Sequence, residues 1–149
     1  MRLKGARTTG LALALGAVVV VGCGDEGPSR EEFTQSATAI CERNTAPIRE
    51  AAGRLLAGGD LPDPREFMEL AQGTIIPRYT AQVNELRELE PPDELSEEYQ
   101  QFLDASAAAR QEIMQNPSAI TSPDSFQEVN RQAEQLGLSS DCRVGPGPG

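Results

Sequence analysis

Apolar side chains recur at intervals of three and four residues from about residue 29 to residue 137. In the first such stretch they are Phe33, Ala37, Ile40, Cys41, Ile48, Ala51 and Leu55. These intervals place side chains on one face of an α-helix, whereas a half-buried strand needs strict alternation of apolar and polar residues. Because no such alternation occurs, the pattern predicts an all-α protein.

Boundary signals divide this region into predicted helices. Ser29 and Asp63 are each followed three residues later by Glu, the spacing of a capping box. Glycines and prolines end the helices. The predicted helices run from Ser29 to Gly58, from Asp63 to Pro91, from Asp93 to Asn116 and from near Ser122 to Gly137. Pro47 and Pro77 are expected to kink or divide the helices that contain them. Three to four amphipathic helices with short turns pack most simply as an antiparallel bundle.

The chain begins with a segment typical of export. Arg2, Lys4 and Arg7 precede the apolar run 11–21, which is shorter than the roughly 20 residues needed to span a bilayer. Its last residues, Val20-Val21-Gly22-Cys23, resemble the lipobox of bacterial lipoprotein signal peptides. The resemblance implies cleavage before Cys23, a lipid on its thiol and anchoring at the outer face of the cytoplasmic membrane. The alternatives are an ordinary secretory peptide and an uncleaved anchor.

These signals predict four regions. They are a lipoprotein signal peptide at 1–22, a flexible tether at 23–29, a helical domain at 30–142 and a disordered Gly/Pro tail at 143–149. The tether contains Gly and Pro, and the tail alternates Gly with Pro, so neither favours a helix.

Two cysteines remain besides Cys23, namely Cys41 on the first apolar stripe and Cys142 after the last predicted helix. An even number of cysteines in an exported chain predicts one disulfide. Since the last helix of an antiparallel bundle ends near the start of the first, the segment before Cys142 must double back, or the first helix must divide at Pro47. A reactive or metal-binding thiol pair is the alternative, although no His or third Cys accompanies it.

The chain resembles small exported lipoproteins of actinobacteria in several loose motifs. They are the lipobox, Phe33 through Ile40-Cys41, Leu86 and Leu89 before Pro91-Pro92, and Leu136-Gly137-Leu138 before Cys142. The resemblance implies a helical domain closed by a disulfide, and it implies no particular activity.

Composition narrows the chemistry further. The 149 residues include 23 Asp and Glu against 13 Lys and Arg, giving a net charge of −10, so nucleic acid is not an expected partner. The absence of His and Trp removes Ser-His-Asp catalysis and the commonest transition-metal ligand. We expect no cofactor and no metal site.

Two kinds of polar group are candidates for chemistry. The acid pairs are Glu31/Glu32, Glu85/Glu88, Glu94/Glu97/Glu98 and Asp60/Asp63, and most lie off the apolar stripes, as on a solvated helix face. Asn44, Tyr79 and Tyr99 instead lie on core faces. They predict either a polar ligand pocket or, as the favoured interpretation, a structural hydrogen-bond network.

These observations together predict a non-enzymatic protein. We expect a lipid-anchored extracytoplasmic helical module that binds an envelope protein or a small ligand as an accessory of the cell envelope. The alternative is an envelope hydrolase that cleaves cell-wall glycan with Asp and Glu alone.

Overall fold

The computed structural model describes residues 27–59, 62–122 and 124–145 of the chain. The expected signal peptide, Cys23 and the first part of the expected tether lie outside these residues. The α-helices are α1 (Arg30–Leu56), α2 (Pro64–Leu70), α3 (Ile76–Leu86), α4 (Ser96–Gln115) and α5 (Gln127–Gln135). The π-helical turn η1 (Ala71–Ile75) joins α2 to α3, and 3₁₀ turns form η2 (Asp93–Leu95), η3 (Pro117–Thr121) and η4 (Ser140–Cys142). All regular structure in the described residues is helical, which confirms the predicted all-α class.

The local signals at helix ends are largely confirmed. Ser29 and Asp63 form the predicted capping boxes at the starts of α1 and α2. Gly137 has a φ of 74°, and the following Leu138 N–H donates to the carbonyl of Ala133 at 2.9 Å, which closes the end of α5. These caps depend only on neighbouring residues, so the sequence alone was sufficient to find them.

The second helical segment breaks beside Pro77, as predicted, since the π-helical turn η1 ends at Ile75 and α3 begins at Ile76. Three other local expectations need correction. Helix α1 is not divided at Pro47. Asp93 begins the 3₁₀ turn η2 and does not cap α4 with its side chain. Helix α5 begins at Gln127, several residues after the predicted start near Ser122. Where the observed helix ends differ from the predicted ones, packing between helices outweighs the helix propensity of the individual residues.

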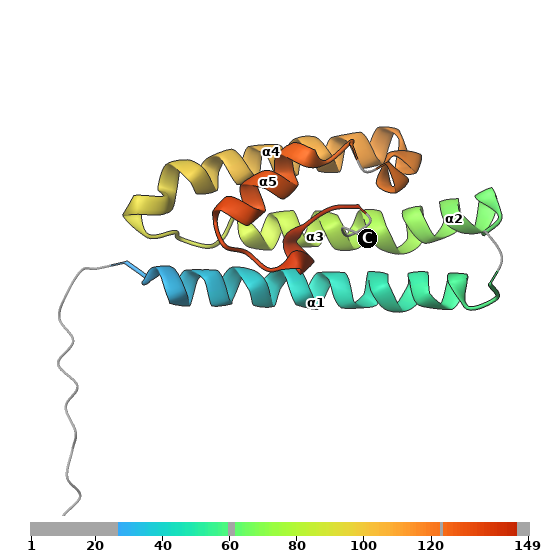
Figure 1. Ribbon diagram of the computed structural model, residues 1–149, viewed down its shortest axis with the longest axis horizontal. Coiled ribbons are helices and arrows are strands. Elements are labelled where there is room, and N and C mark those ends of the chain that lie inside the picture. Colours follow the sequence, from blue (N-terminus) through green and yellow to red (C-terminus); the bar gives the residue numbers. More distant parts are fainter. Residues whose placement is uncertain (1–26, 60–61, 123, 146–149) are drawn as a thin grey trace, which may run out of the picture.

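The long helical segments lie side by side and alternate in direction (Figure 1). The segment α2–η1–α3 packs along α1, and α3 also packs against α4, so α3 lies between those two helices. Helix α5 packs on α4. The hydrophobic core draws on every α-helix except α2, whose side chains are only half-buried or exposed.

Residues 138–145, which we call the C-terminal strap, reverse direction after α5 and return to α1 (Figure 1). Of the two routes considered for reaching Cys41, the structure therefore uses the segment that doubles back, with an undivided first helix. The expectation that the disordered tail begins at residue 143 is wrong for residues 143–145. Val144 is buried in the core, and apolar burial holds this part of the chain. Residues 146–149 lie outside the described chain.

No helix in the described part of the chain is both long enough and apolar enough to cross a bilayer.

Candidate functional site

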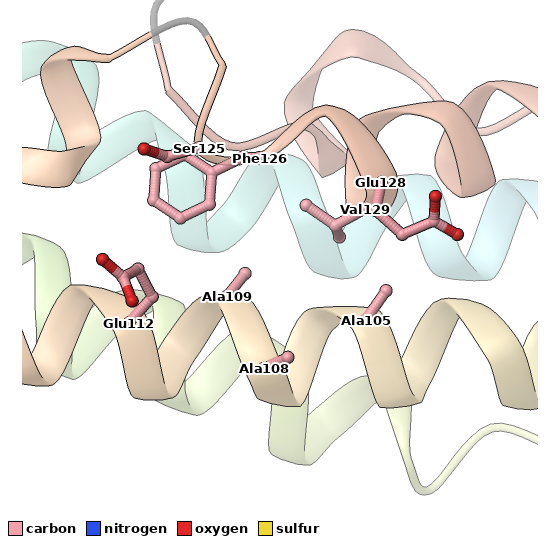
Figure 2. A pocket seen from close by; sticks show the side chains of 8 residues that line it. All are labelled: Ala105, Ala108, Ala109, Glu112, Ser125, Phe126, Glu128 and Val129. Atoms are coloured by element: carbon pink, nitrogen blue, oxygen red, sulfur yellow. The ribbon is translucent and has the colours of Figure 1, made fainter.

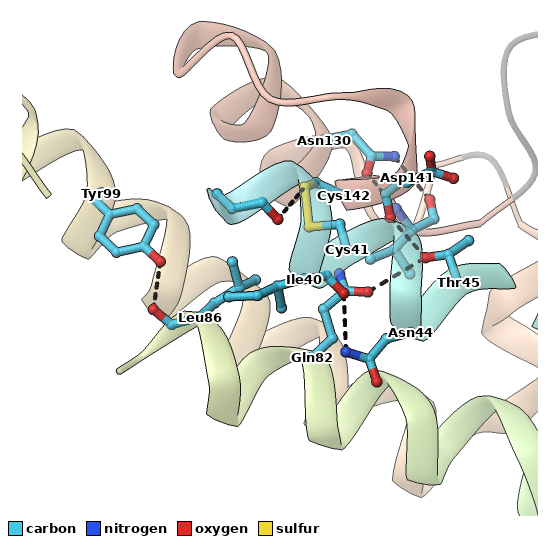
Figure 3. The surroundings of a disulfide bond; sticks show 12 residues. Ile40, Cys41, Asn44, Thr45, Gln82, Leu86, Tyr99, Asn130, Asp141 and Cys142 are labelled. Carbon is cyan, nitrogen blue, oxygen red and sulfur yellow. Dashed lines mark hydrogen bonds between the residues drawn. A yellow bond between two sulfur atoms is a disulfide. The ribbon is translucent and has the colours of Figure 1, made fainter. Parts of the chain in front are cut away.

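A disulfide joins Cys41 of α1 to Cys142 of η4 at a Cα–Cα distance of 5.0 Å (Figure 3). Both residues are buried, with 0% and 1% of their surface exposed. The predicted pairing is therefore confirmed, and these two sulfur atoms are not a free thiol pair. Their position fixes the C-terminal strap to the middle of α1.

Polar contacts hold the C-terminal strap beside the disulfide (Figure 3). The Thr45 hydroxyl donates to the carbonyl of Asp141 at 2.9 Å, and Arg49 pairs with the Asp141 carboxylate. From α5, Asn130 accepts from the Val144 N–H at 2.7 Å and donates to its carbonyl at 2.9 Å. The strap is thus tied to α1 and α5 by bonds that are independent of the sulfur link.

Asn44 is 2% exposed and connects α1 to α3. Its Nδ2 donates to the Ile40 carbonyl at 3.0 Å and to Oε1 of Glu85 at 3.2 Å. Arg43 also pairs with the Glu85 carboxylate. The hydrogen bond from Arg43 is the main cause that lowers the pKa of Glu85, and the bond from Asn44 acts in the same direction. Arg43 and Asn44 of α1 and Glu85 of α3 thus form a polar contact that fixes the register of these two helices.

The hydroxyls of Tyr79 and Tyr99 do not hydrogen-bond to Asn44. Tyr79 donates to the carbonyl of Ser106 at 3.4 Å, and Tyr99 donates to the carbonyl of Leu86. Burial raises the pKa of both hydroxyls above the usual value. Asn44 and the two tyrosines also line neither of the two clefts described below. Each of these three side chains therefore makes its own structural contact. In the described residues they do not surround a common ligand pocket.

The acid pairs do not form a buried carboxylate dyad in the described residues. Glu85 is the only half-buried member of these pairs there, and the others are exposed; Asp60 lies outside the described residues. Glu32 belongs to the capping box of α1, where the hydrogen bond from the Ser29 hydroxyl lowers its pKa. No group of three or more Cys, Asp or Glu side chains in this part of the chain is arranged to hold a metal ion.

A cleft of about 350 Å³ lies between α4 and the start of α5 (Figure 2). We call it the α4–α5 cleft, and it is lined by Ala105, Ala108, Ala109, Glu112, Ser125, Phe126, Glu128 and Val129. The three alanines lie on the α4 side, and Phe126, which precedes α5, and Val129 of α5 lie on the other side. Small side chains on one helix opposite larger ones on the other leave this space open.

No protein-family model, curated protein or solved structure gives a significant match to this chain.

A second cleft, of about 430 Å³, lies where the start of α1 meets the end of α5. It is lined by Arg30, Glu31, Thr34, Gln35, Gln135, Leu136 and Gly137. This places the end of α5 beside the start of α1, as expected for helices that alternate in direction. The cleft is adjacent to the point at which the chain from Cys23 enters the described structure.

Sequence reasoning did not find the α4–α5 cleft or the buried glutamines. Gln132 is 4% exposed, and its Nε2 donates to Glu128 at 2.9 Å and to Gln101 of α4 at 3.5 Å. Its Oε1 is buried and has no hydrogen-bond partner among the described residues. The run of small residues from Ala105 to Ala109 was the available signal, because it predicts close approach of another helix. The sequence did not show which helix would face it.

Proposed function

We propose that this protein is a lipid-anchored extracytoplasmic binding module of the cell envelope, without catalytic activity of its own. The proposal rests mainly on which of the three cysteines form the disulfide. The chain has three, and the disulfide takes Cys41 and Cys142. Cys23 is therefore the one cysteine that this disulfide does not use, and it stands within the lipobox-like sequence. A buried disulfide suits an oxidising compartment outside the cytoplasm.

The proposed architecture of the module is an antiparallel helical bundle on a short tether. The contacts of α3 with both α1 and α4, and those of α5 with α4, support this arrangement. Helix α1 begins at Arg30, soon after Cys23, so the bundle would stand close to the membrane. The acidic chain would be repelled by anionic lipid headgroups, which supports contact with the bilayer through the anchor alone.

Binding suits the described residues better than catalysis. A glycan hydrolase that uses two carboxyl groups needs one that keeps its proton near neutral pH. Hydrogen bonds lower the pKa values of Glu32, Glu85 and Glu128, which favours the charged form and a binding or structural role. The α4–α5 cleft offers a surface that combines apolar side chains with carboxylates.

The anchoring proposal is tested with Cys23→Ser in the full-length protein, expressed in a bacterium that processes lipoproteins. We expect the unmodified protein to incorporate a fatty-acid label and to sediment with membranes, because acyl chains bury methylene groups at about 0.8 kcal/mol each. Cys23→Ser should lose both properties. Gly24→Ser is the matched control, since it changes a neighbouring residue and leaves the thiol in place.

Labelling of the Cys23→Ser protein, or an unlabelled original protein in the soluble fraction, would contradict anchoring through this residue. The binding role is tested separately by chemical crosslinking of the lipidated protein in intact cells. A single stoichiometric partner or a bound small molecule is expected, whereas hydrolysis of purified cell-wall glycan by the protein would support the alternative of an enzyme.

A further inference from the structure

The sulfur atoms of the disulfide are closed off from solvent by the surrounding chain. Cys41 and Cys142 are 0% and 1% exposed. Thiol–disulfide exchange needs a thiolate to attack one of the sulfur atoms directly, so its rate depends on access to that sulfur. A reductant therefore reacts with this disulfide only after some part of the chain moves aside.

The C-terminal strap, which carries Cys142, buries little apolar surface. Its buried side chains are Leu138, Cys142 and Val144, and its other residues are half-buried or exposed. Polar contacts at Asp141 and Val144 tie it to α1 and α5. Segments with few buried apolar contacts open at a lower free energy than the folded core. We therefore expect the strap to open before the helices unfold.

Closing the strap also leaves polar atoms unsatisfied. In the described residues the Oγ atom of Ser139 and the Nε atom of Arg143 are buried and have no hydrogen-bond partner. Buried polar groups are normally hydrogen-bonded, and leaving one unpaired costs free energy that contact with water recovers. Both atoms belong to the strap, so opening it exposes them to water and lowers the free energy of the open state.

We propose that the C-terminal strap is a redox-sensitive switch. It opens as a unit while the α-helices stay folded, and a dithiol reaches the sulfur atoms only in this open state. The disulfide holds Cys142 beside Cys41 throughout, so the residues on either side of Cys142 move and the sulfur link acts as the hinge. This inference goes beyond the proposed function and does not depend on it.

The exchange in the open state transfers two electrons from the dithiol to the protein. One thiolate of the dithiol attacks a sulfur of the disulfide, the S–S bond breaks, and the displaced sulfur takes up a proton. The second thiolate of the reagent then attacks the mixed disulfide, and the other protein sulfur takes up a proton as it leaves. Cys41 and Cys142 become thiols, and the dithiol is oxidised to a disulfide. The strap is afterwards held by its noncovalent contacts alone, so its open state becomes more populated.

The test measures how fast dithiothreitol reduces the full-length Cys23→Ser protein, in which no further thiol of the chain can enter the exchange. Thiol alkylation and mass determination follow the reaction, and the same protein in denaturing urea gives the rate for exposed sulfur atoms. We expect reduction to be slower in the native protein than in urea. It should nevertheless be faster than the urea rate multiplied by the globally unfolded fraction, because the strap opens more often than the whole domain unfolds.

Variants distinguish strap opening from global unfolding. Asn130→Ala removes two hydrogen bonds to the strap and should speed reduction about fivefold to a hundredfold. Arg49→Gln should speed it by up to about fivefold. Arg54→Gln is the matched control, since Arg54 pairs within α1 and its loss should leave the rate unchanged. Tyr99→Phe removes a bond between α4 and α3, so it should lower the stability of the domain without changing the reduction rate.

Amide hydrogen exchange gives a second readout. The Val144 N–H, which donates to Asn130 in the closed strap, should exchange faster in the reduced protein than in the oxidised one. Amides within α4 should keep their protection. Urea denaturation of each variant supplies the global stability with which these rates are compared.

Faster reduction of Tyr99→Phe, in proportion to its lost stability, would show that the exchange needs global unfolding and would overturn the inference. So would an Asn130→Ala protein that is reduced no faster than the protein that keeps Asn130, or native reduction at the rate seen in urea. None of these results bears on lipidation of Cys23 or on a partner found by crosslinking.

Discussion

Single polar side chains in this protein act mainly by bonding to backbone carbonyls inside the core. Tyr79 reaches Ser106 on α4, and Tyr99 reaches Leu86 at the end of α3. Each tyrosine therefore joins α3 and α4 by one bond and buries an aromatic ring beside it. The phenol hydroxyl must stay protonated to donate, so these contacts make the core sensitive to alkaline pH.

Alkaline titration tests this dependence. Burial raises the pKa of Tyr79 and Tyr99 above 10, the value of an unperturbed phenol. Above about pH 10 the unfolded chain therefore binds fewer protons than the folded protein, and the free energy of unfolding falls as the pH rises. We expect tyrosinate absorbance to appear together with loss of helical circular dichroism. The single variants Tyr79→Phe and Tyr99→Phe assign each hydroxyl, and titration near pH 10 with helicity intact would contradict the prediction.

The helices tolerate irregular residues where packing supports them. Pro47 has no N–H to donate to the carbonyl of Arg43, yet α1 continues through it. Buried residues of α1 before Pro47 pack in the core, and contacts with α2 and α3 extend along the rest of the helix. Pro77 lies in the first turn of α3, directly after the π-helical turn η1, where a missing N–H costs less.

Replacing the two prolines separately measures this difference. Pro47→Ala restores an N–H in a helix interior, where proline is about 3 kcal/mol less favourable than alanine. Some packing of the half-buried ring is lost, so we expect the free energy of unfolding to rise by about 1–3 kcal/mol. Pro77→Ala should give a smaller gain. Urea denaturation followed by circular dichroism measures both, and a destabilised Pro47→Ala would show that the ring's contacts outweigh the regained N–H.

The whole molecule is closed by the C-terminal strap, which brings the end of the chain back to α1. The disulfide spans 101 residues of sequence, so it constrains nearly the whole described domain. In the chain-entropy account a loop of about this length stabilises the folded state by roughly 4–5 kcal/mol. Typical domains are stable by only about 5–15 kcal/mol, so the crosslink is a large part of the total.

The double substitution Cys41→Ser and Cys142→Ser tests the contribution of the crosslink. We expect a loss of about 4–5 kcal/mol in the free energy of unfolding by urea denaturation, because the unfolded chain regains its freedom. Thr45, Arg49 and Asn130 still hold the strap, so the variant should fold at low denaturant concentration. A reducing agent should destabilise the original protein to the level of the variant and leave the variant unchanged. A loss below about 1 kcal/mol would contradict the entropic account.

The sequence by itself determined the all-helical class, several helix ends and the crosslink. Spacings of three and four residues, caps such as Ser29 and breakers such as Pro91 act within a few residues, so their effect does not depend on the rest of the fold. The disulfide was predictable because only Cys41 and Cys142 remain once Cys23 is counted with the lipobox-like sequence.

Only the tertiary structure decided which polar groups meet and where a cleft remains open. The contact of Asn44 with Glu85, the bond of Asn130 to the buried Val144 and the position of Ala109 and Phe126 in one cleft each bring together residues far apart in sequence. Such contacts depend on the rotation and spacing of packed helices, which follow from how all side chains of the core fit together. A pattern read along one helix therefore identifies its buried face but not the residue that covers it.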